Sequence, residues 1–196
     1  MFSYTVDDTI SLKLIELSDA NSIYELVDQS RTYLRQWLPW VDGTTKVADS
    51  IDFIRACQKA YVEQIGMFTV IMYNGKIIGT ASYNSLDWRN KIVYIGYWLA
   101  PDYQGQGIMT KVVKALTTYA FEELQFNRVD IRAATSNVKS RSIPERLGFI
   151  YEGTVRDAEW LYDHYVDHAI YGVLARDWQR NMAGMMMQGR ADVTVD

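Results

Sequence analysis

A strand-like run, a turn with two glycines and a helical run follow one another without interruption between residues 92 and 124. Residues 92–99 are rich in β-branched and aromatic side chains, which favour a strand, and apolar residues three or four apart over 107–124 favour a helix. Glycine adopts positive φ values and lets a ligand approach the backbone closely. The first N–H groups of a helix have no partner within the helix, and the helix dipole favours an anion beside them. The turn at residues 104–110 therefore predicts a cradle for phosphate groups.

Two common phosphate-binding patterns are absent from this turn. It contains no Gly-x-x-x-x-Gly-Lys-Ser/Thr of a Walker A loop, and Thr110 stands where a dinucleotide fingerprint needs its third glycine. A Gly-x-Gly pair also serves as a tight structural turn, which is the competing interpretation. Motifs elsewhere in the chain have to decide between the two.

Hydrophobic periodicity predicts a mixture of strands and helices. Asn74-Gly75, between two strand-like runs, is the strongest short signal of a β-hairpin. We expect strands near residues 11–16, 68–73, 76–83, 92–99, 129–134, 149–155 and 165–174, and helices over 19–36, 47–63, 107–124 and 142–147. This order predicts an α/β (α+β) fold with a mixed sheet flanked by helices. One domain spans residues 1–178, and for the methionine-rich tail, residues 179–196, disorder and docking against a partner subunit both fit.

Composition excludes several classes of protein. The net charge is −4, and no run of Lys and Arg occurs that could neutralise a nucleic-acid backbone. No stretch is long and apolar enough for a membrane span, and the N-terminus lacks the pattern of a signal peptide. Cys57 is the single cysteine, so an internal disulfide cannot form. We expect a soluble cytoplasmic protein that binds neither nucleic acid nor membrane.

The turn also matches the pattern of one enzyme family, since residues 104–109 read Gln-Gly-Gln-Gly-Ile-Met. The chain resembles the Gcn5-related N-acetyltransferases (GNAT), whose pyrophosphate loop reads Gln or Arg, two variable residues, Gly, one variable residue, then Gly or Ala. Gln104 and Gly107 match, and Met109 departs at the sixth position. Within the family, the chain most resembles the ribosomal-protein-serine/alanine N-terminal acetyltransferases. The likeness covers residues 10–178, because further segments resemble the family and follow one another in its order. These segments are residues 34–40, 95–99, 137–140 and 147–149.

The resemblance implies a single N-acetyltransferase domain with a mostly antiparallel sheet splayed at its centre, and acetyl-coenzyme A (acetyl-CoA) as co-substrate without a metal. Backbone N–H groups of the turn would bind the pyrophosphate, with side-chain donors from Gln104 and Thr110. The coenzyme arm would pair with the strand that ends in Trp98 and Leu99, and Gly96 stands where a bulge would aid the splay, with a packing accommodation as its alternative role. The implied coenzyme-binding residues are Trp98, Leu99, Gln104, Gly105, Gln106, Gly107, Ile108, Met109, Thr110, Asn137 and Ser140.

Glu159 is the candidate general base. Acetyl transfer needs a neutral amine, and an α-amino group, with a pKa of about 7.7–8.0, needs a weaker base than a lysine does. Glu159 precedes Trp160 and Leu161, an apolar setting that favours the protonated form of a carboxyl group. In the branch that the chain resembles, the equivalent glutamate is the proposed base. A surface ion pair with Arg156 is the alternative role, and Asp157 is the weaker candidate base.

Ser140 is the candidate acid that serves the departing thiolate. The family's Asn-x-x-Ser places a small hydroxyl close to the coenzyme sulfur, and Asn137 with Ser140 fits it, the asparagine capping the next turn and binding the coenzyme arm. Inside a regular helix, the ring of Pro144 would clash with the carbonyl of Ser140. Because residues 142–145 read as a capping box, we expect the helix to begin at Ser142 and to leave Ser140 on a bent turn.

Other side chains give weaker signals. His164 and His168 fall on a predicted strand, about 13 Å apart and without a nearby cysteine, so we expect no metal site. Trp37, Trp40 and Trp88 are expected to line the acceptor cleft, with a plain role in the core as the alternative.

These observations predict an acyltransferase that moves the acetyl group from acetyl-CoA to a primary amine by direct transfer with a carboxylate base. The preferred acceptor is the N-terminal α-amino group of a protein, such as a ribosomal protein. Two alternatives stay open: acetylation of a small-molecule amine (a polyamine or a drug), and a non-catalytic acetyl-CoA-binding sensor. The aromatic load of 14 Tyr and 6 Trp also predicts a homodimer or higher homo-oligomer.

Overall fold

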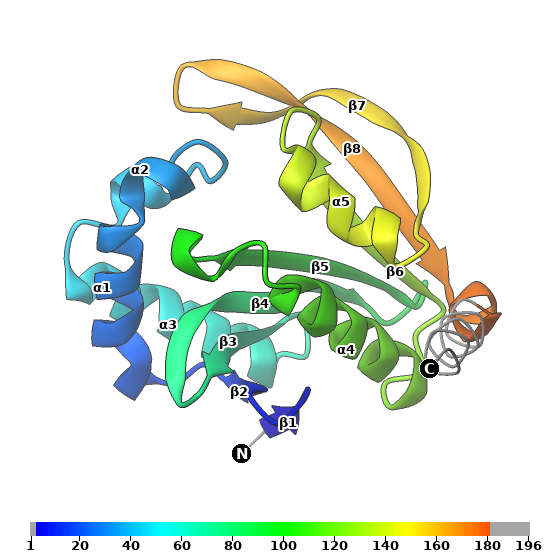
Figure 1. Cartoon of the computed structure of the whole chain (residues 1–196), viewed down its shortest axis with the longest axis horizontal. Helices are drawn as coiled ribbons and strands as arrows, with labels where there is room; N and C mark the ends of the chain where they lie inside the picture. Colours follow the sequence, from blue (N-terminus) through cyan, green and yellow to red (C-terminus); the bar gives the residue numbers. More distant parts are fainter. Residues whose placement is uncertain (1–2, 181–196) are drawn as a thin grey trace, which may run out of the picture.

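The computed structural model describes residues 3–180, and its strands form one mixed sheet (Figure 1). The strands are β1 (Ser3–Thr5), β2 (Ile10–Leu14), β3 (Met67–Tyr73), β4 (Lys76–Asp87), β5 (Ile92–Leu99), β6 (Arg128–Ala134), β7 (Ile150–Leu161) and β8 (His164–Leu174). The helices are α1 (Ala20–Gln29), α2 (Arg31–Leu34), α3 (Val47–Val62), α4 (Ile108–Glu122) and α5 (Val138–Arg146), with short 3-10 turns η1 (Leu17–Asp19), η2 (Val41–Gly43) and η3 (Pro101–Tyr103). This confirms the predicted α/β (α+β) class, while most of the predicted tail, residues 181–196, lies outside the described residues.

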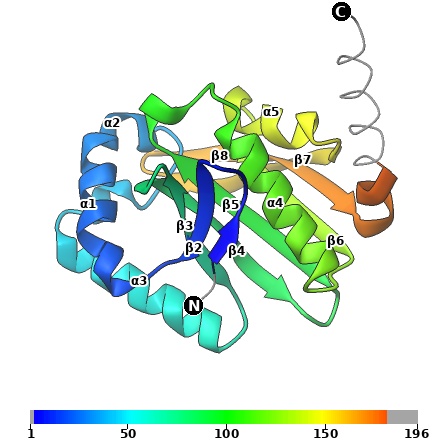
Figure 2. The ribbon, with the colours of Figure 1, turned by 60° about the horizontal axis from the view of Figure 1, so that its bottom comes forward.

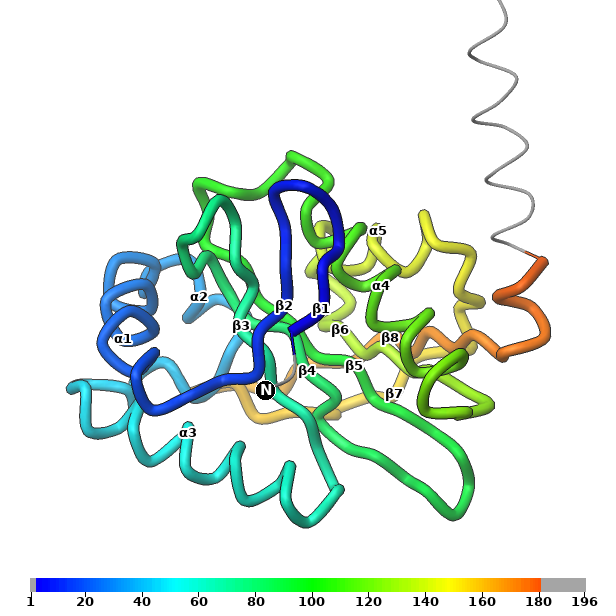
Figure 3. Tube along the Cα trace, turned by 90° about the horizontal axis from the view of Figure 1, so that it is seen from below, coloured from blue at the N-terminus to red at the C-terminus, as the bar shows by residue number. Residues whose placement is uncertain are grey.

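Neighbouring strands of the sheet follow the order β1-β2-β3-β4-β5-β6-β8-β7. Within residues 3–180 the pair β5–β6 is parallel and the other neighbours are antiparallel. Figure 3 shows β1 and β2 side by side at the start of this order. The parallel pair is joined through α4, because parallel strands need a long crossover connection.

The sheet splits between β5 and β6. Their pairing runs only from Ile92 with Arg128 to Ile95 with Ile131. Beyond that point residues 96–99 stay paired with β4, whereas residues 132–134 stay paired with β8. The two halves of the sheet therefore diverge, and Figure 1 shows β8 and β7 running away from β5. The splay that the family resemblance implied is present.

A β-bulge lies beside this split, on β4 and not on β5. The register shifts between Tyr83 and Ser85, which leaves Asn84 as the extra residue. A Cβ atom at Gly96 would overlap with the side-chain amide of Asn84. Gly96 therefore accommodates the bulge of its neighbour, which corrects the expectation that Gly96 itself forms one.

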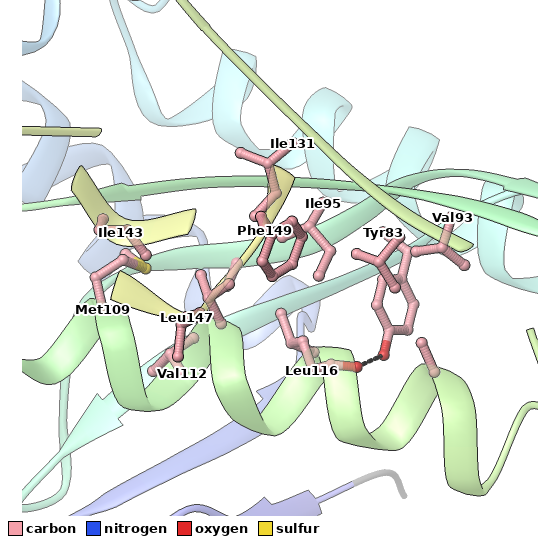
Figure 4. Packing of buried hydrophobic residues seen from close by; sticks show 14 of the residues in the cluster. Tyr83, Val93, Ile95, Met109, Val112, Leu116, Ile131, Ile143, Leu147 and Phe149 are labelled. Carbon is pink, nitrogen blue, oxygen red and sulfur yellow. Dashed lines mark hydrogen bonds between the residues drawn. The ribbon is translucent and has the colours of Figure 1, made fainter. Parts of the chain in front are cut away.

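Helices cover the two faces of the sheet, which we call the α4 face and the α3 face (Figure 2). On the α4 face, residues of α4 and α5 pack against alternate residues of the central strands, among them Ile95 and Ile131. In Figure 4 the buried hydroxyl of Tyr83 points to α4, where it donates to the carbonyl oxygen of Leu116 at 2.5 Å. On the α3 face, residues of α1 and α3 such as Ile54 form a second cluster. Each face of the sheet is therefore covered by a layer of helices.

Several predicted boundaries were wrong for local reasons. The helix expected over 19–36 is divided into η1, α1 and α2, because Ser30 leaves helical geometry with φ −101° and ψ 4°. Strand β1 is too short to show a period, and β7 extends to Leu161 through bulges that break the alternation. No helix within residues 3–180 is both long and apolar enough to cross a membrane.

Candidate functional site

The split between β5 and β6 opens into a cleft of about 1420 Å³. It is lined by the segment after α1, the bulge of β4, strand β5, the turn before α4 with the first turn of that helix, strand β6, helix α5 and the β7–β8 hairpin. Most of the predicted site residues are among its lining, namely Trp37, Trp40, Trp98, Leu99, Gln104, Gly105, Gly107, Ile108, Met109, Thr110, Asn137, Ser140 and Glu159. The fold therefore brings both groups of candidates, for the coenzyme and for the chemistry, to one cavity.

The turn before α4 presents bare backbone to this cleft. Gly105 and Gly107 have φ values of 74° and 73°, in the left-handed region that favours glycine. A Cβ atom at either glycine would meet no atom within 4 Å, so open space lies beside the chain here. Gly107 is also the N-cap of α4, whose first-turn N–H groups have no partner within the helix. The geometry suits a phosphate group.

The two glutamine side chains of the turn have other partners than expected. Nε2 of Gln104 donates to the carbonyl oxygen of Leu99 at 3.1 Å, so this amide closes the turn and is not a free donor. Nε2 of Gln106 donates to the carbonyl oxygen of Asp102 at 3.1 Å, and Gln106 does not line the cleft. Both side chains hold the shape of the turn, while the backbone N–H groups of residues 104–110 remain the predicted donors to the pyrophosphate.

Two cations of α5 reach the same turn, and the sequence reasoning missed them. Nζ of Lys139 lies 3.3 Å from Oε1 of Gln104, and Nη2 of Arg146 donates to Oγ1 of Thr110 at 3.1 Å. Both residues line the cleft. Their seven-residue spacing is about two helical turns and puts them on one face of α5, which was the available signal. Positive charge beside the N-terminus of α4 strengthens the case for an anionic ligand.

Helix α5 begins at Val138 and not at Ser142 as expected. Asn137 is its N-cap, and its Oδ1 accepts a hydrogen bond from the backbone N–H of Ser140 at 3.1 Å. Pro144 consequently lies inside the helix. Because Asn137 caps it, the helix begins before the capping box at Ser142.

Pro144 shapes the surroundings of Ser140. Proline has no N–H, so the Ser140 carbonyl lacks its helical donor, and the hydroxyl of Tyr97 donates to it instead at 3.1 Å. The hydroxyl of Ser140 in turn donates to Oη of Tyr97 at 3.3 Å. Burial raises the pKa of Tyr97 well above its ordinary value, so its hydroxyl stays neutral. Ser140 thus sits on the first turn of a regular helix beside a second hydroxyl that the sequence reasoning did not identify.

Glu159 faces His168 across the β7–β8 hairpin. Its Oε2 lies 3.5 Å from Nε2 of His168, and the two side chains are 33% and 18% exposed. Trp160 packs edge-on against Tyr165, with 4.8 Å between ring centroids, and both rings are exposed. The bulge between Val155 and Glu159 creates this arrangement. The apolar setting expected for Glu159 is therefore wrong: an imidazole is its neighbour, and not Arg156.

The segment after α1 and the tip of the β7–β8 hairpin meet across the cleft. The hydroxyl of Tyr162 donates to the carbonyl oxygen of Leu38 at 2.6 Å, and the guanidinium of Arg35 lies 3.9 Å from the centre of the Tyr162 ring. We call this contact the hairpin bridge. Trp37 and Trp40 line the cleft beside it.

Trp88 lies away from the cleft, at the far end of the β4–β5 hairpin. Its ring is 4.7 Å from that of Phe126, and its Nε1 donates to the carbonyl oxygen of Gln64 at 2.6 Å. This corrects the expectation that it lines the acceptor cleft. His164 and His168 lie on β8 as expected, and within residues 3–180 no three His, Cys, Asp or Glu side chains gather as metal ligands.

Comparison with known proteins adds independent information. The family model described as "Acetyltransferase (GNAT) domain" matches residues 10–150. YdaF of Bacillus subtilis (strain 168) is 37% identical over 181 residues, which cover 91% of this chain and 98% of that protein. The ribosomal-protein-serine acetyltransferase of Escherichia coli (strain K12) is 28% identical over 166 residues, 85% of this chain and 93% of the relative.

Solved structures are similar over the same range. The ribosomal L7/L12 alpha-N-protein acetyltransferase RimL in complex with coenzyme A has a TM-score of 0.86 at 26% identity, covering 88% of this chain and 98% of that one. The microcin C7 self-immunity acetyltransferase MccE in complex with acetyl-CoA and AMP has a TM-score of 0.83 at 30% identity, covering 86% and 94%. Both similar proteins bind the coenzyme that the cleft suits.

Proposed function

The chain belongs to the GNAT acetyltransferase family and is an acyltransferase, and from this premise we propose that it acetylates the N-terminal α-amino group of a protein, foremost a ribosomal protein. One observation carries the proposal: a single cleft holds a phosphate cradle at residues 104–110 and, on the opposite side of the split, the carboxylate of Glu159 beside His168. An α-amino group needs only such a modest base.

The cleft fits acetyl-CoA, which supplies an activated acetyl thioester. Open space beside Gly105 and Gly107 leaves the backbone N–H groups accessible, and Lys139 with Arg146 adds positive charge for the pyrophosphate. Along β5, Trp98 and Leu99 pair with β4 and not with β6, so their other edge is available to the amides of the coenzyme arm. These contacts extend the list that the family resemblance implied.

Glu159 accepts the proton of the acceptor ammonium in this proposal. His168 acts as a positioning residue, because its ring nitrogen lies close enough to hold the carboxylate toward the cleft. Both groups remain partly exposed, so protons exchange with solvent between turnovers. Neutralising the amine at the point of attack is what general-base catalysis contributes.

Ser140 provides the hydrogen bond for the departing thiolate when its hydroxyl turns from Oη of Tyr97, its acceptor in this structure, to the sulfur. Its hydroxyl lines the cleft at the start of α5, where the helix dipole also favours negative charge. Tyr97, whose hydroxyl lies 3.3 Å away, orients the serine side chain. The carbonyl oxygen of Ser140, which has no helical donor because residue 144 is proline, accepts from the Tyr97 hydroxyl and holds it there.

The preference for a protein N-terminus rests on the shape of the acceptor side and on the relatives. The hairpin bridge crosses the cleft, which favours a slender acceptor such as the end of an extended chain over a lysine on a folded surface. The relatives named above include proteins named for ribosomal-protein acetylation.

A small-molecule amine is the second candidate acceptor. The support is MccE, which at 30% identity binds AMP, a small polar molecule, together with acetyl-CoA. A non-catalytic sensor does not fit, because the chain is an acyltransferase.

Labelled acetyl-CoA separates these acceptors. The wild-type protein is incubated with ribosomal proteins, with peptides whose α-amino group is free or blocked, and with a panel of polyamines and amino drugs. We expect label on the free N-termini and none on the blocked peptides. Label on polyamines or drugs alone, or on lysine side chains of the blocked peptides, would overturn the proposal.

Cellular placement and assembly extend this proposal. We place the enzyme in the cytoplasm, where ribosomal proteins are made, with residues 1–178 as its catalytic domain. Exposed aromatic residues on the outer strands, among them Tyr151, Trp160 and Tyr165, support a homodimer or higher homo-oligomer. Light scattering at micromolar concentration tests this, since a mass near 22.6 kDa would show a monomer.

A further inference from the structure

A second cavity of about 330 Å³ lies on the α3 face of the sheet, beside the cleft. We call it the side pocket. Five of its lining residues also line the cleft: Leu38, Trp40, Asn84, Tyr97 and Trp98. The rings of Trp40 and Trp98 are in contact, with 6.2 Å between centroids, so these two indoles stand where the cavities adjoin. The side pocket therefore adjoins the site proposed for the acceptor.

Every residue that lines the side pocket is uncharged. Its walls on the helix side are apolar and include Ile23 and Val27 of α1 and Phe53 of α3. A charged group that entered would lose its hydration without meeting an opposite charge, which is strongly unfavourable. The lining thus selects against acidic and basic side chains.

Hydroxyl and amide groups on β4 and α3 interrupt this apolar lining. Thr80, Ser82 and Asn84 alternate along the central strand β4 and line the pocket from the sheet, while Ser50 lines it from α3. Ser50 is only 2% exposed, and its hydroxyl has no hydrogen-bond partner among the described residues. Buried polar groups are normally paired, so an unpaired hydroxyl at a cavity indicates a place for a ligand atom.

We propose that the side pocket receives the first side chain of the acceptor, and that the enzyme prefers an uncharged, bulky residue such as Leu, Met or Phe there. The inference rests on the proposed function, since it assumes a peptide acceptor. An engineered apolar cavity of about 150 Å³ already binds benzene, so the side pocket has room beyond a serine or alanine side chain. Asn84, which lines both cavities, is available to the acceptor backbone, and the Ser50 hydroxyl can pair with a side-chain acceptor such as the methionine sulfur.

Peptides that differ only in their first residue test this inference. We compare kcat/KM for Gly, Leu, Glu and Arg at that position in the wild type and in two variants that fill the pocket from opposite walls, Ser50→Leu and Thr80→Leu. Ala48→Leu is the matched control, because it adds the same side chain to α3 at an exposed position outside both cavities. Melting temperature and acetyl-CoA affinity check that each variant folds.

In the wild type, we expect the Leu peptide to exceed the Gly, Glu and Arg peptides by about 10-fold or more, the usual value of filling an apolar pocket. Both filled variants should lose the Leu-to-Gly ratio, and Ala48→Leu should keep it. Charged peptides as good as Leu, or an unchanged ratio in a folded filled variant, would overturn the inference. If neither filled variant folds, the wild-type profile decides.

The same experiment separates this inference from the proposed function. Equal rates for all peptides with the wild type would overturn the inference about the side pocket, but not the proposed N-terminal acetylation. A wild type that acetylates no peptide overturns both.

Discussion

On the α4 face of the split, the coenzyme cradle comes from one stretch of chain, residues 97–146. The acceptor side, in contrast, collects its residues from separate stretches near residues 23–53, 68, 80–98 and 158–168. The cradle presents mainly backbone groups of a strand, a turn and two helix starts, whereas the acceptor side presents side chains that meet only after the whole sheet has formed. A coenzyme common to a family can thus be bound by local structure, and the choice of acceptor depends on long-range packing. A substitution on one side should therefore leave the other side unchanged.

Glu159→Gln should have the largest effect and should act on the acceptor side alone. We expect kcat to fall by about 10²–10⁴, the usual range for loss of a general base, while calorimetry shows unchanged acetyl-CoA affinity. If the acidic limb of the wild-type rate profile belongs to the enzyme, it should stay in place between two acceptors of different pKa and vanish in the variant.

Glu152→Gln is the matched control, since Glu152 lies on the same strand, outside the cleft, and pairs with Arg128. It should cost stability and leave kcat unchanged. A Glu159→Gln enzyme that kept more than about a third of the wild-type rate would contradict the role of base.

Gly107→Val should weaken the cradle. The residue has φ 73°, and that conformation costs a non-glycine residue about 1–2 kcal/mol. The valine variant should therefore leave this conformation when free. Regaining it on binding should raise the Kd for acetyl-CoA about tenfold. Gly75→Val is the control, because Gly75 also has positive φ, at 78°, with open space beside it, in the distant β3–β4 turn. It should lose similar stability without any change in Kd, and equal Kd values in the two variants would refute the cradle.

Tyr162→Phe should loosen the hairpin bridge. It removes the hydrogen bond to the carbonyl oxygen of Leu38 and leaves the ring under Arg35, so about 0.5–1.5 kcal/mol is lost. We expect a several-fold rise in KM for a peptide acceptor and no change for acetyl-CoA. Tyr165→Phe on the same hairpin should change neither constant, and a matching rise there would mean that the bridge has no special role.

The smallest effect concerns Cys57 in the helix layer of the α3 face. Burial raises the pKa of its thiol from 9.0 to about 12, so above pH 9 the unfolded chain ionises this group before the folded one does. The stabilising contribution is therefore complete at pH 7 and falls by about 0.8 kcal/mol at pH 9.5. Urea unfolding of the wild type and of Cys57→Ala should reveal the loss as a difference between the two pH slopes. Parallel slopes would contradict it.

The donor side could be predicted from the sequence because its signals are local. Two glycines between a strand and a helix already locate the cradle, and the β-branched and aromatic side chains of residues 92–99 indicate the strand that carries Trp98. Ser142 misled the prediction of α5, since a capping box and a proline usually mark a helix start, yet Asn137 begins the helix earlier. Pro144 is tolerated inside α5 because Tyr97, remote in sequence, occupies the carbonyl that the proline leaves without a donor.

The acceptor side could be predicted only in part. Glu159 was found through the family resemblance, but its neighbour His168 depends on a bulge in β7 that no periodicity reveals. Trp37, Trp40 and Trp88 are alike as residues, and only the topology shows that Trp88 lies at the other end of the β4–β5 hairpin. Ser50 and Thr80 gave no signal at all, because small polar residues in a helix and in a strand are common.

The hairpin bridge also has a consequence for the time at which the enzyme matures during its own synthesis. Tyr162 and Leu38 are 124 residues apart. Because the chain grows from the N-terminus, the hydrogen bond between them cannot form until almost the entire domain has left the ribosome. The last strand, β8, carries His168 and pairs with β6 only after that. The nascent chain therefore exposes its cradle sequence before the acceptor site can form, and acetyl transfer has to await the synthesis of β8.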